Sequence, residues 1–282
     1  MTTENKTEKK VVMTHAGKAH IDEILACTLL SIKEHGNLSI IRGYDPEKVD
    51  EVNYVVDCGG KHDARKFFDH HQDSPDVEGV SAVTLVARRF FPKLYNHLRS
   101  FFDRIDKQDN HGIGAVGKPA EVFPLIQSEF FLITAFQEWP MSAVRPLQMA
   151  LSKELEYIDK VEELKDWLLE TSTVVVKADG LRWLRLDKEP DDLTVEGVRA
   201  LNEAVKPLAQ ENNIDIIEGY ADNVRNPGCK TLFRTEYGTQ KGIDLSSFDG
   251  YPGVKFAHKA GFLVVFDPAG LPGSIQDLLK NS

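Results

Sequence analysis

The stretch VVMTHAGKAHIDEILACTLLSIKE, residues 11–34, contains the pattern that decides the fold. Its apolar start, residues 11–13, predicts a short buried strand that ends near Thr14. Residues 21–34 follow with helical spacing. The apolar side chains that share one side of this predicted helix are Ile21, Leu25, Leu29 and Ile32. A strand that leads directly into a helix is the first half of a β-α-β unit.

The same alternation continues on both sides of this stretch. We expect further strands at 38–42, 53–57 and 67–69, and helices at 80–91 and 94–105. Strands that alternate with helices predict an α/β fold with a parallel sheet, and ligands of such sheets gather at the carboxyl ends of the strands. His15 and His70 each follow a predicted strand and Asp57 ends one, so we expect the three at one common site.

A second predicted domain follows the first. Residues 112–146 are rich in Gly, Pro and aromatic residues and predict a less regular bridge with one or two short helices, and 147–170 predict a helix. The later elements that we expect are strands at 174–178, 181–186, 214–220, 230–235 and 262–266 and a helix at 194–211. The boundaries that we predict are a flexible tail at 1–10, an N-terminal domain at 11–145, a connecting helix at 146–171 and a smaller C-terminal α/β domain at 172–282.

Composition limits the classes of protein that are possible. The chain has 282 residues and a net charge of −10, and an acidic surface repels long polyanions, which disfavours tight binding of duplex nucleic acid. No apolar run approaches the roughly 18 residues of a membrane span. The polar start and the three scattered cysteines favour a cytoplasmic protein without a disulfide framework, and the oligomeric state is left open.

Nitrogen and oxygen donors are dense in the first 110 residues. They are His15, His20, Asp22, Asp57, Asp69, His70, His71, Asp106 and Asp109. The amino end of a helix near His20 offers free N–H groups for a phosphate. Each element alone has an ordinary explanation, such as a strand-end cap or a chance pair of histidines. Their combination in this order favours a metal site.

These residues resemble the DHH phosphoesterase superfamily, which is named for an Asp-His-His motif such as the one at 69–71. Within it, the chain is most similar to the melanocyte-proliferating-gene exonuclease family. The segments that carry this resemblance are THAGKAHIDEILACTLL (14–30), VVDCGGKHD (55–63), FFDHHQ (67–72), IDKQDNHGI (105–113) and, more weakly, VKFAHKAGF (254–262).

The resemblance implies a DHH-type catalytic domain that binds two divalent metal ions. His15, His20 and Asp57 would hold one ion. The residues implied for the other ion are Asp22, Asp57, His70 and one aspartate of a 106–109 loop, for which we prefer Asp109 to Asp106. Mn²⁺ is the preferred ion, and the mixed ligand set also admits Mg²⁺, Co²⁺ or Zn²⁺.

Catalytic and substrate-binding residues are also implied. We expect His71 to donate a proton to the leaving oxygen, with Asp69 orienting an imidazole or, equally, capping the strand end. From Arg225 to Lys259, six Lys and Arg stand against three acidic residues. Arg225, Arg234 and His258 are therefore candidate phosphate-binding residues in the second domain, although a solvated charged face would look the same.

The function implied is a 3′–5′ exonuclease, a phosphodiesterase that acts on single-stranded or short oligonucleotides. Its partner would be a nucleic acid or nucleotide substrate, with short single strands favoured by the acidic surface and with no membrane. One alternative is hydrolysis of a small nucleotide, a cyclic dinucleotide or pyrophosphate. The other is a metal-stabilised binding module without turnover.

Overall fold

The computed structural model describes residues 9–112, 115, 129–176 and 180–272, and the statements on structure refer to these residues. The chain divides into two compact units, residues 1–158 and 159–282, and each is described by itself. The division falls within helix α6 (Pro140–Thr171). The four-part division proposed from the sequence stays a prediction.

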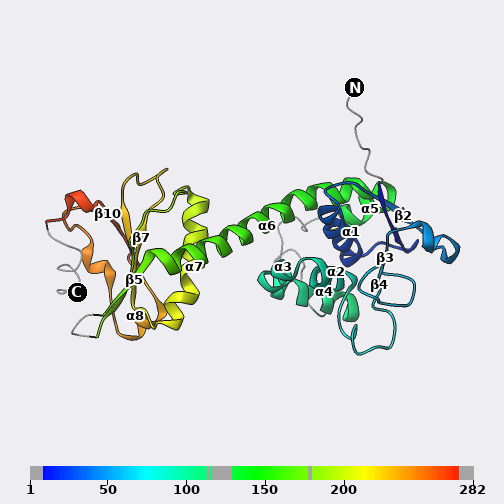
Figure 1. The fold of residues 1–282 in the computed structure, drawn as a ribbon, viewed down its shortest axis with the longest axis horizontal. Helices are drawn as coiled ribbons and strands as arrows, with labels where there is room; N and C mark the ends of the chain where they lie inside the picture. The colour runs from blue at the N-terminus through cyan, green and yellow to red at the C-terminus, as the bar shows by residue number, and fades with distance from the viewer. Residues whose placement is uncertain (1–8, 113–114, 116–128, 177–179, 273–282) are drawn as a thin grey trace, which may run out of the picture. The chain divides into compact units, whose positions relative to one another are not determined.

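The first unit is built on a parallel sheet, as the sequence predicted. Its four strands stand in the order β2-β1-β3-β4, and every neighbouring pair is parallel. Figure 1 labels β2, β3 and β4. The strands are β1 (Lys10–Thr14), β2 (Leu38–Arg42), β3 (Tyr54–Val56) and β4 (Phe67–Phe68). Because the strands are parallel, the loops that follow β1, β3 and β4 start at the same edge of the sheet.

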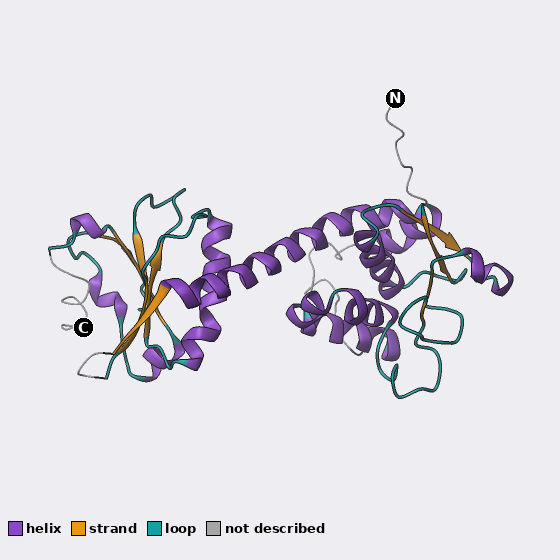
Figure 2. Ribbon diagram, in the orientation of Figure 1, coloured by secondary structure: helices purple, strands orange, loops and turns teal. Residues whose placement is uncertain are grey.

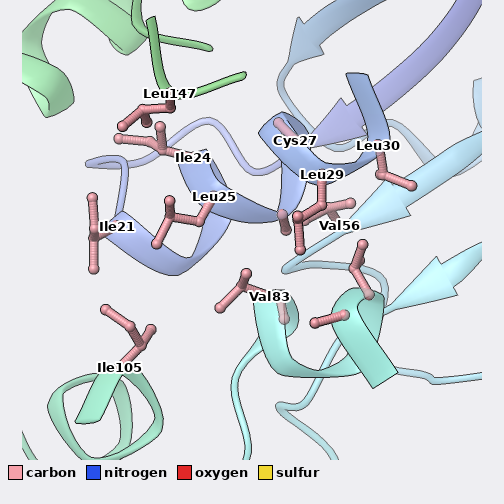
Figure 3. Close-up of a cluster of buried hydrophobic side chains, with 14 of the residues drawn as sticks. Ile21, Ile24, Leu25, Cys27, Leu29, Leu30, Val56, Val83, Ile105 and Leu147 are labelled. Atoms are coloured by element: carbon pink, nitrogen blue, oxygen red, sulfur yellow. The ribbon is translucent and has the colours of Figure 1, made fainter. Parts of the chain in front are cut away.

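Helix α1 (Ile21–Lys33) lies at the centre of the first unit. It packs against α2 (Ala82–Phe90), α4 (Arg99–His111) and α5 (Glu129–Glu138). Figure 3 shows its side chains facing Val83 of α2, Ile105 of α4 and Leu147 of α6. All residues from 21 to 31 are buried, so this helix is enclosed on more sides than the single apolar face that we predicted.

The helices after α2 differ from the prediction. Residues 94–105 do not form one helix, because the chain turns between α3 (Pro92–His97) and α4. The predicted 106–109 loop is also wrong. Helix α4 continues to His111 and ends where Gly112 adopts φ +79°, so Asp106 and Asp109 lie on a helix. Part of the predicted 112–146 bridge lies outside the described residues, and the rest contains α5 and the start of α6.

The second unit has a mixed six-stranded sheet with the order β5-β6-β7-β8-β10-β9, and helix α7 lies along one side of it (Figure 2). Strands β6 and β7 pair in parallel and the other neighbours are antiparallel. The elements are β5 (Ser172–Val176), β6 (Arg182–Leu186), α7 (Val195–Glu211), β7 (Ile216–Tyr220), β8 (Lys230–Arg234), α8 (Glu236–Gln240), β9 (Val254–Ala257) and β10 (Leu263–Phe266). Strand β9 was not predicted. No helix in the described part of the chain is long and apolar enough to cross a membrane.

Candidate metal centre

Three predicted ligands meet at the carboxyl edge of the parallel sheet. His15 follows β1, Asp57 follows β3 and His70 comes two residues after β4. Asp57 is 3% exposed and lies between the two histidines. Its Oδ2 is 3.4 Å from Nε2 of His15, and its Oδ1 is 3.2 Å from Nε2 of His70. The carboxylate of Asp57 is therefore the centre of this group of side chains.

The backbone at Asp57 is strained. Asp57 has φ +56°, a left-handed conformation that costs most residues energy but that aspartate tolerates better than bulkier side chains. The turn continues through Gly59 and Gly60, which also have positive φ. A Cβ at Gly59 would lie 3.2 Å from the ring of Phe67, so that turn packs closely on β4. Strain of this kind is often found at functional sites.

Helices α1 and α4 complete the group. His20 is the N-cap of α1, and Asp22 lies in its first turn, fully buried. Asp109 of α4 places Oδ2 3.0 Å from Nε2 of His70 and Oδ1 3.9 Å from Nδ1 of His20. The described residues contain three groups of side chains in which the donor atoms of each group lie within 4.8 Å of one another. They are His15, His20 and Asp57; His20, Asp22 and Asp109; and Asp57, His70 and His71.

The electrostatics of these residues fit divalent cations. Burial, together with the nearby carboxylates of Asp57 and Asp109, raises the pKa of Asp22 well above its ordinary value. Hydrogen bonds with Asp57 and then Glu23 raise the pKa of His15 to about 10. Within the described residues, Oδ1 of Asp22 is buried without a hydrogen bond, and Oδ2 of Asp57 is buried with Nε2 of His15 3.4 Å away. Buried carboxylate oxygens that lack donors are the ligands that a hard or borderline cation takes.

His70 and Asp57 support each other electrostatically. Burial alone would lower the pKa of His70, but its contacts with Asp109 and Asp57 outweigh that effect and raise the pKa to about 10. Burial would raise the pKa of Asp57, yet its hydrogen bonds with His15 and His70 bring it to about 2. In the metal-free protein, the histidines thus supply the positive charge that these carboxylates require.

Asp69 pairs with His71, whose Nδ1 also lies 3.6 Å from Oδ1 of Asp57. Oδ1 of Asp69 is 2.7 Å from Nδ1 of His71 and also accepts a hydrogen bond from the His71 backbone N–H. Oδ2 of Asp69 accepts from the N–H of Gly60 at 2.5 Å. Asp69 is buried, whereas the His71 side chain is 57% exposed. A buried, anchored carboxylate at Nδ1 fixes the ring orientation of an imidazole whose other side reaches solvent.

Asp106 has a different environment from Asp109. Its Oδ1 accepts hydrogen bonds from the backbone N–H of Ser81 (2.9 Å), the Ser81 hydroxyl (2.6 Å) and the Thr84 hydroxyl (2.6 Å). Ser81 is the N-cap of α2, so Asp106 ties α4 to the start of α2. Burial raises the pKa of Asp106, and none of the three donor groups includes it.

The two aspartates should therefore respond differently to replacement. Asp106→Ala is expected to bind as many metal ions as the parent and to lower the free energy of unfolding by about 2–4 kcal/mol, because it leaves buried donors without an acceptor. Asp109→Ala is expected to bind fewer metal ions than the parent, while the free energy of unfolding of the metal-free protein changes less than in Asp106→Ala, because Asp57 still contacts His70. Elemental analysis and denaturant unfolding with a chelator measure the two effects. Loss of an ion in Asp106→Ala alone would reverse the assignment.

Two residues that we did not predict also reach this edge. Glu23, in the first turn of α1, is fully buried with Oε2 3.1 Å from Nε2 of His15. Arg42 ends β2 and donates to the backbone carbonyl of Gly17 at 2.7 Å. The rule that ligands gather at the carboxyl ends of parallel strands applied to Arg42 as well, and that signal was present in the sequence.

Two hollows flank the group of donors. One, of about 400 Å³, lies beside His70; its lining includes Gln72, Asp73, Glu78 and Asn110. The other, of about 230 Å³, lies beside His20 and Asp109; its lining includes Lys18, Ile21 and Ile133. A phosphoester at the donors would thus have room on both sides.

Of the three candidate phosphate-binding residues in the second unit, two lie close together. Arg234 and His258 both contact Ala260: Nη2 of Arg234 donates to its carbonyl at 3.1 Å, and Nδ1 of His258 accepts from its N–H at 3.1 Å. Arg234 also donates to the carbonyl of Ile243, so backbone oxygens occupy much of its guanidinium. Arg225 lies in the loop before β8, at the opposite end of that strand from Arg234.

Comparison with known proteins is most informative for the segment that contains this edge. Residues 11–79 match the family model MYG1_exonuc, which is described as "Uncharacterised protein family (UPF0160)". This segment resembles the MYG1 exonucleases. The MYG1-like segment includes β1 to β4 and every ligand candidate except the two aspartates of α4.

Two individual relatives are similar to this chain over a length close to that of the family match. The human MYG1 exonuclease is 48% identical over 63 residues, which are 22% of this chain and 17% of that protein. A MYG1 protein of Schizosaccharomyces pombe is 42% identical over 62 residues, or 22% of this chain and 19% of that protein. The chain thus matches less than a fifth of the length of these relatives.

Among solved structures, a crystal structure of the exonuclease RecJ bound to manganese aligns with 93% of this chain and 87% of its own. The sequence identity is 13% and the TM-score is 0.28, values too low to support an argument about fold or function.

Proposed function

We propose that this chain is a two-metal phosphodiesterase and that it removes nucleotides from the 3′ end of single-stranded or short oligonucleotides. The observation that carries the proposal is the meeting of imidazole and carboxylate donors at the carboxyl edge of a parallel sheet, in three groups that share Asp57 and His20. The similarity of residues 11–79 to the MYG1 exonucleases supports the same reading.

The proposed ligand assignment is the one that the family resemblance implies. His15, His20 and Asp57 would hold one ion, and Asp22, Asp57, His70 and Asp109 would hold the second, with Mn²⁺ preferred. Asp106 would act from outside the ligand set. When bound, two such cations lower the pKa of a water and offset the charge of the phosphoryl oxygens.

The remaining chemistry falls to the Asp69–His71 pair. Oδ1 of Asp69 lies 2.7 Å from Nδ1 of His71 and so orients the ring. The exposed His71 would then give a proton to the leaving oxygen. Proton donation by a positioned imidazole typically accelerates such a step by about 10²–10⁴-fold.

A panel of substrates tests the proposal. The full chain, loaded with Mn²⁺ or Mg²⁺, is offered a 3′-labelled and a 5′-labelled pentanucleotide, a duplex, a cyclic dinucleotide and pyrophosphate side by side. Stepwise shortening of the 5′-labelled pentanucleotide supports a 3′–5′ exonuclease. Faster turnover of the cyclic dinucleotide or of pyrophosphate would favour a small-molecule hydrolase. Bound metal without hydrolysis of any of these would reject an enzyme.

Substrate selection is proposed for the second unit. The acidic surface of the chain favours short substrates, because long polyanions are repelled. Locally, the stretch from Arg225 to Lys259 has more basic than acidic residues. A phosphate held there, away from the attacked one, would supply binding energy that positions the ester.

His258→Ala tests this role with less disturbance of the fold than Arg234→Ala would cause. It is expected to raise KM for oligonucleotides roughly tenfold, the cost of one charge-assisted hydrogen bond. Turnover of bis-p-nitrophenyl phosphate, which lacks a remote phosphate, should be unchanged. Arg225→Ala should act in the same direction. Arg234→Ala is less useful, because the loss of its bonds to two backbone carbonyls would disturb the fold.

The control is Lys206→Ala, which removes an exposed cation of α7 in the same unit. Steady-state kinetics on both substrates give the answer. An equal loss of activity on the oligonucleotide and on the minimal ester would place His258 in the chemistry or the fold instead of in substrate binding.

A further inference from the structure

The loop from His15 to His20 carries two of the proposed ligands, yet it contains no regular secondary structure. The rings of His15 and His20 lie 5.5 Å apart between centroids. Ligands on a free loop would have to be ordered each time that a metal binds, at a cost in conformational entropy. What holds this loop in place is therefore important for metal affinity.

Arg42 holds the start of the loop. Its Nη2 donates to the carbonyl of Gly17 at 2.7 Å and to the carbonyl of His15 at 3.3 Å. The Arg42 side chain is only 12% exposed, and its guanidinium lies 5.5 Å from the centre of the Phe136 ring. The planar, multivalent guanidinium suits this position, because a lysine ammonium has no rigid fork of donors.

Glu23 holds the end of the loop. Its Oε2 accepts a hydrogen bond from the backbone N–H of His20 at 3.4 Å and lies 3.1 Å from Nε2 of His15. Its other oxygen, Oε1, is 3.7 Å from Nε of Arg42. Glu23 is fully buried, and a buried carboxylate needs a partner of opposite charge. If a cation binds the imidazole of His15, Arg42 remains as the positively charged partner of Glu23.

We propose that Glu23 and Arg42 form a clamp that positions the loop from His15 to His20 for metal binding. This clamp connects β2 to the first turn of α1. Arg42 hydrogen-bonds to the start of the loop, and Glu23 hydrogen-bonds to its end. Glu23 is absent from the three groups of mutually close donors in the described residues, so its role is positioning and not ligation. The inference rests on the proposed function where it concerns metal, whereas the order of the loop is a property of the metal-free chain.

Three variants of the full chain test the clamp. Arg42→Lys keeps the charge but loses the fork, and Glu23→Gln keeps an acceptor for the His20 N–H. Arg88→Lys is the matched control, since Arg88 donates to the hydroxyl of Tyr95 in the same unit, away from the loop. Mn²⁺ titration by calorimetry gives affinities, elemental analysis gives the number of ions at saturation, and hydrogen exchange of the metal-free proteins gives the order of the loop.

Arg42→Lys is expected to weaken one Mn²⁺ site by about 10–100-fold, the usual effect of losing a group that orients a metal ligand. The other site should be nearly unchanged. Glu23→Gln should weaken the same site by no more than about tenfold, and both variants should still bind two ions at saturation. The backbone amides of residues 15–20 should exchange faster in metal-free Arg42→Lys than in the parent or in Arg88→Lys.

Parental affinity and parental exchange in Arg42→Lys would overturn the clamp. A drop from two ions to one in Glu23→Gln would overturn it as well, because Glu23 would then be a ligand. If the parent chain binds no Mn²⁺, the proposed function fails, but hydrogen exchange of the loop still decides whether the clamp exists.

Discussion

Asp57→Asn is expected to lose both metal ions and all measurable phosphodiesterase activity. The carboxylate of Asp57 contacts His15 on one side and His70 on the other, so its loss affects both proposed sites. Asparagine is the replacement of choice, because it tolerates the left-handed φ of +56° at this position and has nearly the same shape. Elemental analysis of the purified variant measures the ions directly.

The thermal stability of Asp57→Asn gives a second readout. At a concentration of about 1,000 times Kd, a metal that binds only the folded state adds about 4 kcal/mol. For a unit of this size, one such ion corresponds to a rise in Tm of roughly 8–16 °C, and two ions to about twice that. Mn²⁺ should produce that rise in the parent and none in Asp57→Asn. His20→Ala, which touches one proposed site, should lose mainly one ion. Two tightly bound ions in Asp57→Asn would show that this carboxylate does not bridge.

His71→Ala is expected to keep both ions and to lower kcat by roughly 10²–10⁴-fold, the usual contribution of a general acid. His70→Ala, by contrast, is expected to lose a metal ion and activity together, since Nε2 of His70 lies near both Asp57 and Asp109. Asp69→Asn should resemble His71→Ala more weakly, because it removes the carboxylate that orients the His71 ring.

The alternative to a general-acid role for His71 is that it binds metal. His71 also belongs to a group of donors with Asp57 and His70 that lie within 4.8 Å, so a ligand role is geometrically open. Equal loss of metal in His70→Ala and His71→Ala would establish that role and remove the general acid. His97→Ala serves as the control, because His97 contacts Glu154 on another face of the same unit.

The sequence was sufficient to predict those features that depend on local pattern. Strand ends could be placed from short apolar runs, and one rule of parallel sheets then put His15, Asp57 and His70 at a common edge, where they lie. Strand β9 was missed, because its four residues are flanked by glycine, proline and charged side chains that read as a loop. The predicted 106–109 loop was wrong, because helix α4 continues through it to His111.

Features that depend on tertiary packing were beyond sequence patterns. Asp106 and Asp109 have similar sequence surroundings, and only the packing of α4 against α2 gives them different neighbours. Glu23 looked like an ordinary acid in the first turn of a helix. Its burial against Arg42 follows from the approach of β2 to α1, which no local pattern specifies.

The arrangement of the parallel strands has a kinetic consequence. The donors around Asp57 come from β1, β3, β4, α1 and α4, elements far apart along the chain, so they meet only after the sheet has formed. A transition state for folding that has not yet paired these strands would contain no metal site. Bound metal would then stabilise the native state alone and slow unfolding, while the rate of folding would stay that of the metal-free chain. The cation would thus slow unfolding of the native protein without accelerating its folding.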